Sequence, residues 1–273
     1  MVPPAGRVRA RRSLSQNFLV DHNLRRKLVA ALEANSHDTV LEVGPGHGEL
    51  SELLVGEVDR LILVEKDDRL YDHLRGRWHE RSDVEITHAD ALEIDLSERT
   101  RTTGPLRVIS NVPYSITSPL LFRFLEMHPA ARRILVVVQE EVGRRIVADP
   151  GTRAYGALSV GVRARATARI AFRLGRQAFR PVPDVESVAV VIDPVPERLS
   201  PDSAEALRGL TRVAFSRRRK QLRGILRDAP EYGLASGAAE ALLSELGIDP
   251  SARPETLCPE IFLQLAERLG KPV

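Results

Sequence analysis

The sequence predicts an α/β fold in which helices cover both faces of a parallel sheet, followed by a small all-helical domain. Short apolar runs rich in β-branched residues alternate with helical runs as far as residue 138. A glycine-rich turn over residues 44–48 joins one such strand to a helix-like run, as in the first half of a mononucleotide-binding βαβ unit. Strand signals end at Pro194 and Pro196. We therefore expect a flexible basic arm over 1–12, a Rossmann-like domain over 13–195 and a helical domain over 196–273.

Composition and charge restrict the class of protein. The 273 residues carry a formal charge of +3, with no apolar stretch long enough to span a bilayer and no secretory signal. The single cysteine, Cys258, excludes an intrachain disulfide and a cysteine-cluster metal site. We expect a cytoplasmic protein that binds no metal and does not associate with a membrane.

The N-terminal region combines a basic arm with a capped helix. Residues 1–12 contain four arginines and no acid, which suits either a solvated tail or an arm that touches phosphate. Asp21 is a suitable N-cap for a helix over Asn23–Ala34, whose leucines and valine share one face.

The remaining elements of the large domain follow in alternation. The expected strands are Val40–Val43, Arg60–Val64, Val84–His88, Leu106–Ser110 and Arg133–Val138. The expected helical runs between them are Glu49–Leu54, Asp67–Arg77 and Ser118–Met127. Ala166–Leu174 and Ser187–Ile192 alternate like strands and are expected to form a closing antiparallel pair. This rhythm favours a sheet that is mainly parallel.

Three helices are expected in the C-terminal domain, over Ser203–Arg227, Gly237–Leu246 and Pro259–Leu269. Gly247 suits the C′ position of the second helix, and Cys258 the N-cap of the third with Pro259 at N1. A structural role for Cys258 is therefore expected rather than a nucleophilic one.

Polar groups follow four successive strands at their carboxyl ends, where open parallel sheets bind ligands. They are the glycine turn, Glu65, Asp90 and the segment Asn111-Val-Pro-Tyr114. Glu65 lies roughly twenty residues past the glycines, where an acid accepts hydrogen bonds from ribose hydroxyls. Asp90 is placed to accept from the exocyclic amine of an adenine, although a turn or N-cap role remains an alternative.

The segment Asn111–Tyr114 suits a planar, conjugated amine as substrate. The Asn111 side-chain oxygen and the Val112 carbonyl are two acceptors for one NH2 group, Pro113 stiffens the turn, and Tyr114 offers a stacking face. Acceptors on the amine hydrogens localise the nitrogen lone pair and stabilise the positive charge that develops during attack on an electrophile. An ordinary strand-end turn with a buried tyrosine is the alternative.

Several motifs together resemble one enzyme family. SQNFLVD, LEVGPGHGEL, NVPYSITSPLL, FRPVPDVESVAV and AFSRRRKQLRGIL look like the KsgA-type ribosomal RNA adenine dimethyltransferases, over about residues 11–269. The resemblance implies a class I S-adenosylmethionine-dependent methyltransferase that dimethylates two adjacent adenosines near the 3′ end of small-subunit rRNA, within a pre-30S particle and as a monomer.

The resemblance also implies roles for individual residues. The implied cofactor contacts are Asn17, Leu19, Gly44, Gly46, Glu65, Asp90 and Asn111. The implied catalytic residues are Asn111, Pro113, Tyr114 and Phe179, with the two aromatic rings on opposite faces of an adenine that has left its stack. The basic cluster Arg217, Arg218, Arg219, Lys220 and Arg223 is expected to bind RNA phosphates.

Two departures leave alternatives open. Ser15 stands where KsgA-type proteins usually have glycine, and a serine there is more typical of Erm enzymes, which methylate large-subunit rRNA. Val112 replaces the commoner leucine at a position that contributes its backbone. An Erm-type enzyme and a non-catalytic RNA-binding assembly factor are therefore the alternatives. A nicotinamide dehydrogenase is disfavoured because the third glycine is out of register.

Overall fold

The computed structural model describes residues 8, 11, 16–101, 104–111, 114–128, 130–195 and 199–271. It divides into two compact units, one of residues 1–143 and 168–194 and the other of residues 144–167 and 195–273. Within the described part of the chain, no helix is both long and apolar enough to cross a membrane.

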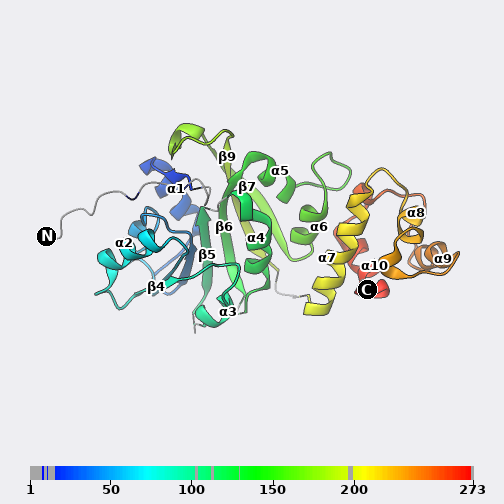
Figure 1. The fold of residues 1–273 in the computed structure, drawn as a ribbon, viewed down its shortest axis with the longest axis horizontal. Helices are drawn as coiled ribbons and strands as arrows, with labels where there is room; N and C mark the ends of the chain where they lie inside the picture. The colour runs from blue at the N-terminus through cyan, green and yellow to red at the C-terminus, as the bar shows by residue number, and fades with distance from the viewer. Residues whose placement is uncertain are drawn as a thin grey trace. The chain divides into compact units, whose positions relative to one another are not determined.

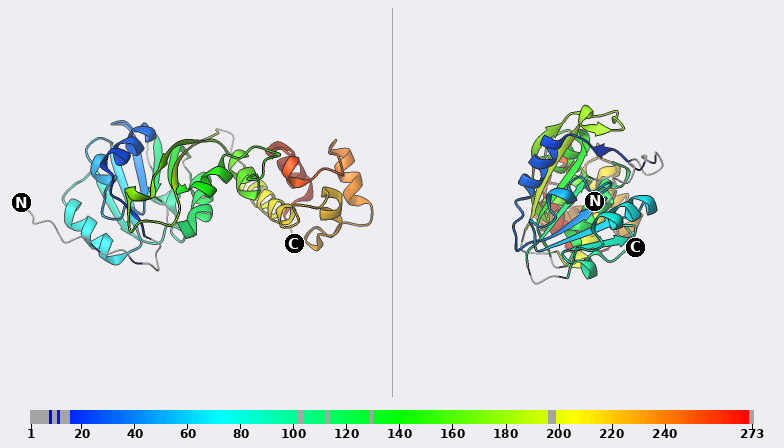
Figure 2. Two further views of the ribbon diagram at one scale, coloured as in Figure 1. Left: turned by 90° about the horizontal axis from the view of Figure 1, so that it is seen from above. Right: turned by 90° about the vertical axis from the view of Figure 1, so that its left-hand side faces the viewer.

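The first unit is built on a seven-stranded sheet in the order β4-β3-β2-β5-β6-β9-β7, with helices on both sides of it (Figures 1 and 2). The strands are β2 (Thr39–Val43), β3 (Arg60–Glu65), β4 (Val84–His88), β5 (Leu106–Asn111), β6 (Ala131–Gln139), β7 (Ala166–Leu174) and β9 (Ser187–Pro194). β2 pairs in parallel with both β3 and β5, and β9 pairs antiparallel with β6. The predicted doubly wound sheet and its five parallel strands are confirmed.

The chain reverses its winding direction between β2 and β5. From β2 it proceeds outward to β3 and β4, then returns to the other side of β2 for β5 and β6. The carboxyl ends of these two central strands therefore lie at a topological switch point, the place where open α/β sheets hold ligands.

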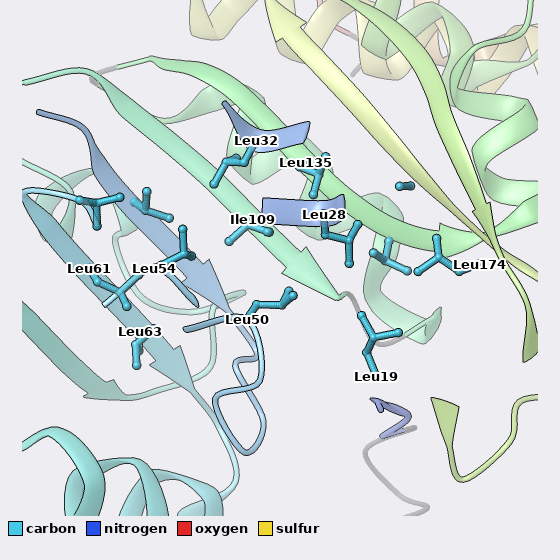
Figure 3. Packing of buried hydrophobic residues seen from close by; sticks show 14 of the residues in the cluster. Leu19, Leu28, Leu32, Leu50, Leu54, Leu61, Leu63, Ile109, Leu135 and Leu174 are labelled. Carbon is cyan, nitrogen blue, oxygen red and sulfur yellow. The ribbon is translucent and has the colours of Figure 1, made fainter. Parts of the chain in front are cut away.

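One face of the sheet is covered by α1 (His22–Leu32), a short 3-10 segment η2 (Ser51–Leu53) and α2 (Asp68–Trp78). Figure 3 shows Leu28 and Leu32 of α1 beside Ile109 and Leu135 of the sheet, all of them buried. Asp21 caps α1 as predicted, because its carboxylate accepts the backbone N–H of Leu24 at 3.0 Å. This packing fixes the strand ends that carry the polar groups.

On the other face, α4 (Thr117–Glu126) buries Leu120, Leu121 and Phe124. α3 (Leu96–Arg99) is a single turn capped by Asp95. A two-stranded ladder joins β1 (Phe18–Leu19) to β8 (Phe179–Arg180), which follows a 3-10 turn, η4 (Arg176–Ala178). Phe18 and Leu19 are therefore held against the start of the proline-rich loop.

Two details of the chain between β2 and β7 differ from expectation. The run Glu49–Leu54 forms only the three-residue η2 rather than an α-helix, because a tight series of turns follows the glycines. Two helices between β6 and β7 were not predicted, α5 (Glu140–Ile146) and α6 (Ala157–Arg163). Both are short, and helices of two turns leave little periodicity to detect.

The second unit is helical, as expected, with α7 (Pro201–Ser216), α8 (Leu222–Arg227), α9 (Ala238–Glu245) and α10 (Pro259–Leu269), coloured yellow to red in Figure 2. The single helix predicted over Ser203–Arg227 is divided in two, with a non-helical segment over 217–221. Cys258 and Pro259 occupy the N-cap and N1 positions of α10, as predicted.

Residues 144–167 belong to this second unit and not to the Rossmann-like unit, in which the predicted boundary at 195 placed them. Tyr155 explains the difference, because it is fully buried among α7 and α10 side chains such as Leu207 and Phe262. Its hydroxyl donates to the carbonyl of Leu257 at 2.8 Å. The helical core is thus completed by a segment that precedes β7 in sequence.

Candidate active site

A cavity of about 240 Å³ lies at the carboxyl ends of the central strands. Its lining comprises Gln16–Leu19, Glu42–Gly46, Glu49, Leu50, Val64–Lys66, Leu70, Ala89–Ala91, Asn111 and Tyr114–Ile116. All seven residues expected to contact the cofactor are among them, together with Tyr114. The predicted convergence of four strand ends on one crevice therefore agrees with the structure.

The three glycines of the turn have three different reasons to be glycine. All have positive φ, at 69° for Gly44, 63° for Gly46 and 83° for Gly48. A Cβ on Gly44 would meet nothing within 4 Å, so this backbone opens onto the cavity. A Cβ on Gly46 would lie 3.0 Å from the Phe18 ring, and one on Gly48 only 2.4 Å from Trp78. Only the first two glycines line the cavity, and the third makes room for α2.

Glu65 ends β3 and is almost fully buried. Its carboxylate accepts the backbone N–H of Gly46 at 3.2 Å and that of Asp67 at 2.9 Å. Burial raises the pKa of Glu65, while these two N–H donors act in the opposite direction. Glu65 thereby ties the glycine turn to the start of α2 and still retains lone pairs for further donors.

Asp67 connects this corner to the N-terminal segment. Its buried carboxylate accepts from the Arg69 guanidinium at 2.8 Å and from the Gln16 amide at 3.2 Å. Although burial alone would raise it, the pKa of Asp67 lies well below its usual range because of these donors. Arg11, one of two described residues of the predicted arm, pairs with exposed Asp68 at 3.0 Å. The rest of that arm lies outside the described residues.

Asp90 follows β4, and both of its oxygens have partners. Oδ1 accepts the N–H of Leu92 at 2.9 Å, and Oδ2 accepts from the Lys66 ammonium at 2.5 Å. Burial alone would raise the pKa of Asp90, but these donors outweigh it and the pKa is lowered. Both the adenine acceptor and the turn acid that the sequence suggested are compatible with this geometry, because Oδ1 forms the turn and Oδ2 faces an exposed cation.

Asn111 is the last residue of β5. Its Nδ2 donates to the backbone carbonyl of Asn17 at 3.0 Å, which orients the amide and leaves Oδ1 as its acceptor end. Val112 and Pro113, the centre of the expected turn, lie outside the described residues. Asn17 and the end of β5, 94 residues apart, thus meet at the cavity wall.

The two predicted stacking aromatics lie in different environments. Tyr114 lines the cavity and is half-buried, and its hydroxyl is 2.7 Å from the hydroxyl of Ser187. Burial raises the pKa of Tyr114, so the phenol stays neutral. Phe179 is fully buried in the core beside Leu19 and does not line the cavity. Stacking by Phe179 would require its ring to leave that core.

Glu42 is a lining residue that the sequence analysis missed. It lies within β2, is 2% exposed and accepts from the Ser51 hydroxyl at 2.6 Å. Burial raises its pKa to about 8, partly offset by that hydrogen bond. The available signal was an acid in the otherwise apolar strand Thr39–Val43.

The pH dependence of stability should reveal Glu42. The pKa of Glu42 is higher in the folded state than in the unfolded state. The stability that the neutral Glu42 carboxyl contributes to the folded state is therefore fully present below about pH 4.5 and is lost as pH rises toward 8. Relative to wild type, Glu42→Gln should therefore gain stability with pH, by about 2–4 kcal/mol between pH 5 and 8.5. Urea denaturation across this range measures the difference. Glu57→Gln, which removes an exposed carboxylate, is the control, and a flat difference for Glu42→Gln would contradict the assignment.

The basic cluster of the second unit is largely committed to internal contacts. Arg218 pairs with Glu255 at 2.7 Å and also donates to the carbonyls of Arg153 and Thr152. Arg217 donates to the Asp228 carbonyl at 2.8 Å, and Arg223 lies 3.5 Å from Glu240. Lys220 and Arg219 are exposed, Lys220 with Asp228 at 3.6 Å. Arg218, one of the five residues predicted to bind RNA, therefore has the contacts of a structural residue.

Among the residues that the structure describes, no group of three or more His, Cys, Asp or Glu side chains could hold a metal ion.

Known proteins resemble this chain over most of its length. Residues 7–271 match the ribosomal RNA adenine dimethylase family. The Ribosomal RNA small subunit methyltransferase A of Nitratidesulfovibrio vulgaris strain DP4 is 40% identical over 269 residues, which are 96% of this chain and 97% of that protein. The protein of the same name from Geobacter metallireducens is 38% identical, over 96% of each chain.

Solved structures share the fold. A dimethyladenosine transferase from Plasmodium falciparum superposes with a TM-score of 0.76 at 24% identity, over 91% of this chain and 95% of that one. The 23S rRNA methyltransferase ErmE superposes with a TM-score of 0.66 at 26% identity, over 92% and 99%. The predicted class I methyltransferase fold is thus confirmed. With a family match across nearly its whole length, the chain belongs to the ribosomal RNA adenine dimethylases.

Proposed function

We propose that this protein transfers methyl groups from S-adenosylmethionine to the N6 amines of two adjacent adenosines near the 3′ end of small-subunit rRNA, during ribosome assembly. The observation that carries the proposal is the anchored amide of Asn111 at the cavity wall. The small-subunit target is supported by relatives of that name at about 40% identity, against 26% for the large-subunit enzyme ErmE. We place the reaction in the cytoplasm, on a pre-30S particle, and expect a monomer.

The cavity fits the proposed cofactor. Four acids and one lysine line it. Glu42 is mostly protonated at neutral pH and Lys66 is paired with Asp90, so Glu49 and Glu65 are the acids by which the walls favour a cationic ligand such as a sulfonium. Gly44 leaves room where a Cβ would stand. S-adenosylmethionine, when bound, supplies an electrophilic methyl group. Asn17, Leu19, Gly44 and Gly46 would hold it by close contact, Glu65 by the ribose hydroxyls and Asp90 by the adenine amine.

The protein's task is to make a poor nucleophile reactive. The lone pair of an adenine amine is delocalised into the ring. Asn111 Oδ1, assisted by the Val112 carbonyl, would accept the amine hydrogens, localise the lone pair and stabilise the charge that develops on nitrogen. Pro113 would stiffen that turn. Glu42 and Asp90 need not act as bases, because positioning and electrostatics supply most of the rate.

Tyr114 would present a ring face to the target base, and Ser187 would set the tilt of that ring. We expect Tyr114→Ala to raise the KM for RNA about tenfold, since base–aromatic stacking contributes about 1–3 kcal/mol per base. Tyr114→Phe keeps the ring and should stay within about threefold of wild type in KM. Steady-state kinetics on undermethylated small subunits measure both. An unchanged KM and kcat in Tyr114→Ala would remove base stacking from the proposal.

The corresponding Phe179→Ala experiment does not isolate stacking. Phe179 is fully buried, and truncating a core phenylalanine costs about 3–5 kcal/mol of stability. A loss of activity in that variant would reflect the core as much as the base, so Tyr114 is the informative position.

Arg219 is the clearest candidate for RNA contact in the basic cluster, because its side chain is exposed. Each phosphate that it neutralises would release counterions and steepen the salt dependence of binding. Arg217, Lys220 and Arg223 could join it by exchanging their internal partners for phosphate.

One mapping experiment distinguishes the candidate functions. The protein is incubated with labelled S-adenosylmethionine and either undermethylated small subunits or protein-depleted 23S rRNA, and the labelled nucleotides are mapped. Label on two adjacent small-subunit adenosines supports the proposal. Label on 23S rRNA alone indicates an Erm-type enzyme. No label, with RNA bound, indicates a non-catalytic assembly factor.

A further inference from the structure

Asp90 and Lys66 form an ion pair at the adenine end of the proposed cofactor site. Both line the cavity, yet their exposure differs: the Lys66 side chain is 59% exposed and that of Asp90 is 14% exposed. The ammonium lies 2.5 Å from Asp90 Oδ2, while Oδ1 is used by the Leu92 N–H. The lysine therefore occupies the one carboxylate oxygen that does not serve the turn.

The backbone beneath this ion pair is fixed, whereas the lysine side chain is not. The Lys66 carbonyl lies 3.2 Å from the His88 ring nitrogen Nε2, and the Ala89 N–H donates to the Glu65 carbonyl at 3.0 Å. These contacts join the ends of β3 and β4. The Lys66 side chain, by contrast, is mostly exposed, so it can swing away without disturbing the strand.

An adenine amine and a lysine ammonium can each donate a hydrogen bond to the Asp90 carboxylate. Each presents N–H donors to a carboxylate oxygen, and Oδ2 already holds one such donor at close range. We propose that Lys66 is a displaceable substitute for the adenine amine, which keeps Asp90 paired until a purine takes its place. The inference rests on the proposed role of Asp90 in binding adenine.

The energetics favour such an exchange. An ion pair whose cation is mostly exposed is weak and is screened by salt, so it yields readily to a ligand. A carboxylate that is 14% exposed would lose more by having no partner at that oxygen. Lys66 therefore lowers the affinity for adenine slightly. It also prevents the site from being left with an unpaired acid.

Two neutral nucleosides test the proposal without the charge of the full cofactor. They are 5′-methylthioadenosine and 5′-methylthioinosine, which carries an oxo group in place of the amine. We expect Lys66→Met to bind the adenine compound about two- to fivefold more tightly than wild type, and the inosine compound no more tightly. Lys66→Arg retains a cation and should restore the wild-type affinity. Lys27→Met, which removes an exposed lysine of α1, is the matched control, and calorimetric titration measures all four proteins.

The outcomes separate this inference from the function on which it rests. Weaker binding of the adenine compound by Lys66→Met, no change, or an equal gain for both nucleosides would overturn the role of Lys66. Asp90→Asn distinguishes the two levels. If it abolishes the preference for adenine while Lys66→Met has no effect, only the Lys66 proposal fails. If it leaves that preference intact, the assignment of Asp90 to adenine fails and the Lys66 proposal fails with it.

Discussion

Asn111→Ala is expected to slow methyl transfer about 10²- to 10³-fold, the usual cost of removing one preorganised group that stabilises developing charge. The alanine has no acceptor for the target amine, and the hydrogen bond from Nδ2 to the Asn17 carbonyl is lost. Affinity for the cofactor should change little, because Glu65, Asp90 and the glycine turn remain. Single-turnover transfer to undermethylated small subunits measures the rate, and calorimetric titration with S-adenosylmethionine measures the affinity.

Asn111→Asp is the companion variant. It keeps an oxygen acceptor but has no Nδ2 donor for Asn17, so it should recover only part of the lost rate. Wild-type turnover in Asn111→Ala would show that the acceptor account of catalysis is wrong. A melting temperature near that of the wild type in both variants would confirm that the loss is chemical.

Gly48→Ala should produce the largest loss of stability of any substitution in the glycine turn. Its φ of 83° disfavours a Cβ, and the added carbon would lie 2.4 Å from Trp78 Cη2 and 3.2 Å from Leu74. Positive φ costs about 1 kcal/mol, and overpacking a core adds about 1–3 kcal/mol. We therefore expect a loss of about 2–4 kcal/mol in urea denaturation.

Gly44→Ala is the matched control, because its φ is also positive but nothing lies within 4 Å of the added carbon. It should cost only about 1 kcal/mol in stability, from its backbone conformation. The methyl group would enter the cavity, so cofactor affinity should fall instead. Equal stability losses in the two variants would contradict the distinct roles given to these glycines. In a Trp78→Leu background, Gly48→Ala should cost less than it does in the wild type, because the smaller side chain makes room.

Much of the site follows from the sequence because strand ends are local features. An apolar run that ends in a polar residue identifies the carboxyl end of a buried strand, and parallel pairing brings such ends together. Glu65, Asp90 and Asn111 could be placed in this way. The glycine turn could be located from the sequence, but the separate roles of its three glycines could not be predicted. The approach of Trp78 to Gly48, for example, depends on how α2 packs.

What the sequence did not reveal depends on which atoms meet across long separations. Nothing in the local sequence shows that Asp90 is paired with Lys66 or that Arg218 forms an ion pair with Glu255. The motif around Phe179 predicts that this residue lies at the active site, but its ring is buried in the core beside Leu19. Glu42 was overlooked because a single acid within an apolar strand does not by itself indicate a functional site. Its significance depends on its burial, which only the structure shows.

The division of the chain has a consequence for synthesis on the ribosome. Tyr155 and its neighbours emerge long before α7 and α10, the partners on which they pack. Until residue 269 has been made, that intervening segment has no complete partner surface and exposes apolar side chains to the cell. A nascent chain released near residue 195 would therefore hold a finished sheet and an orphaned insertion, which is a natural target for chaperones and proteases.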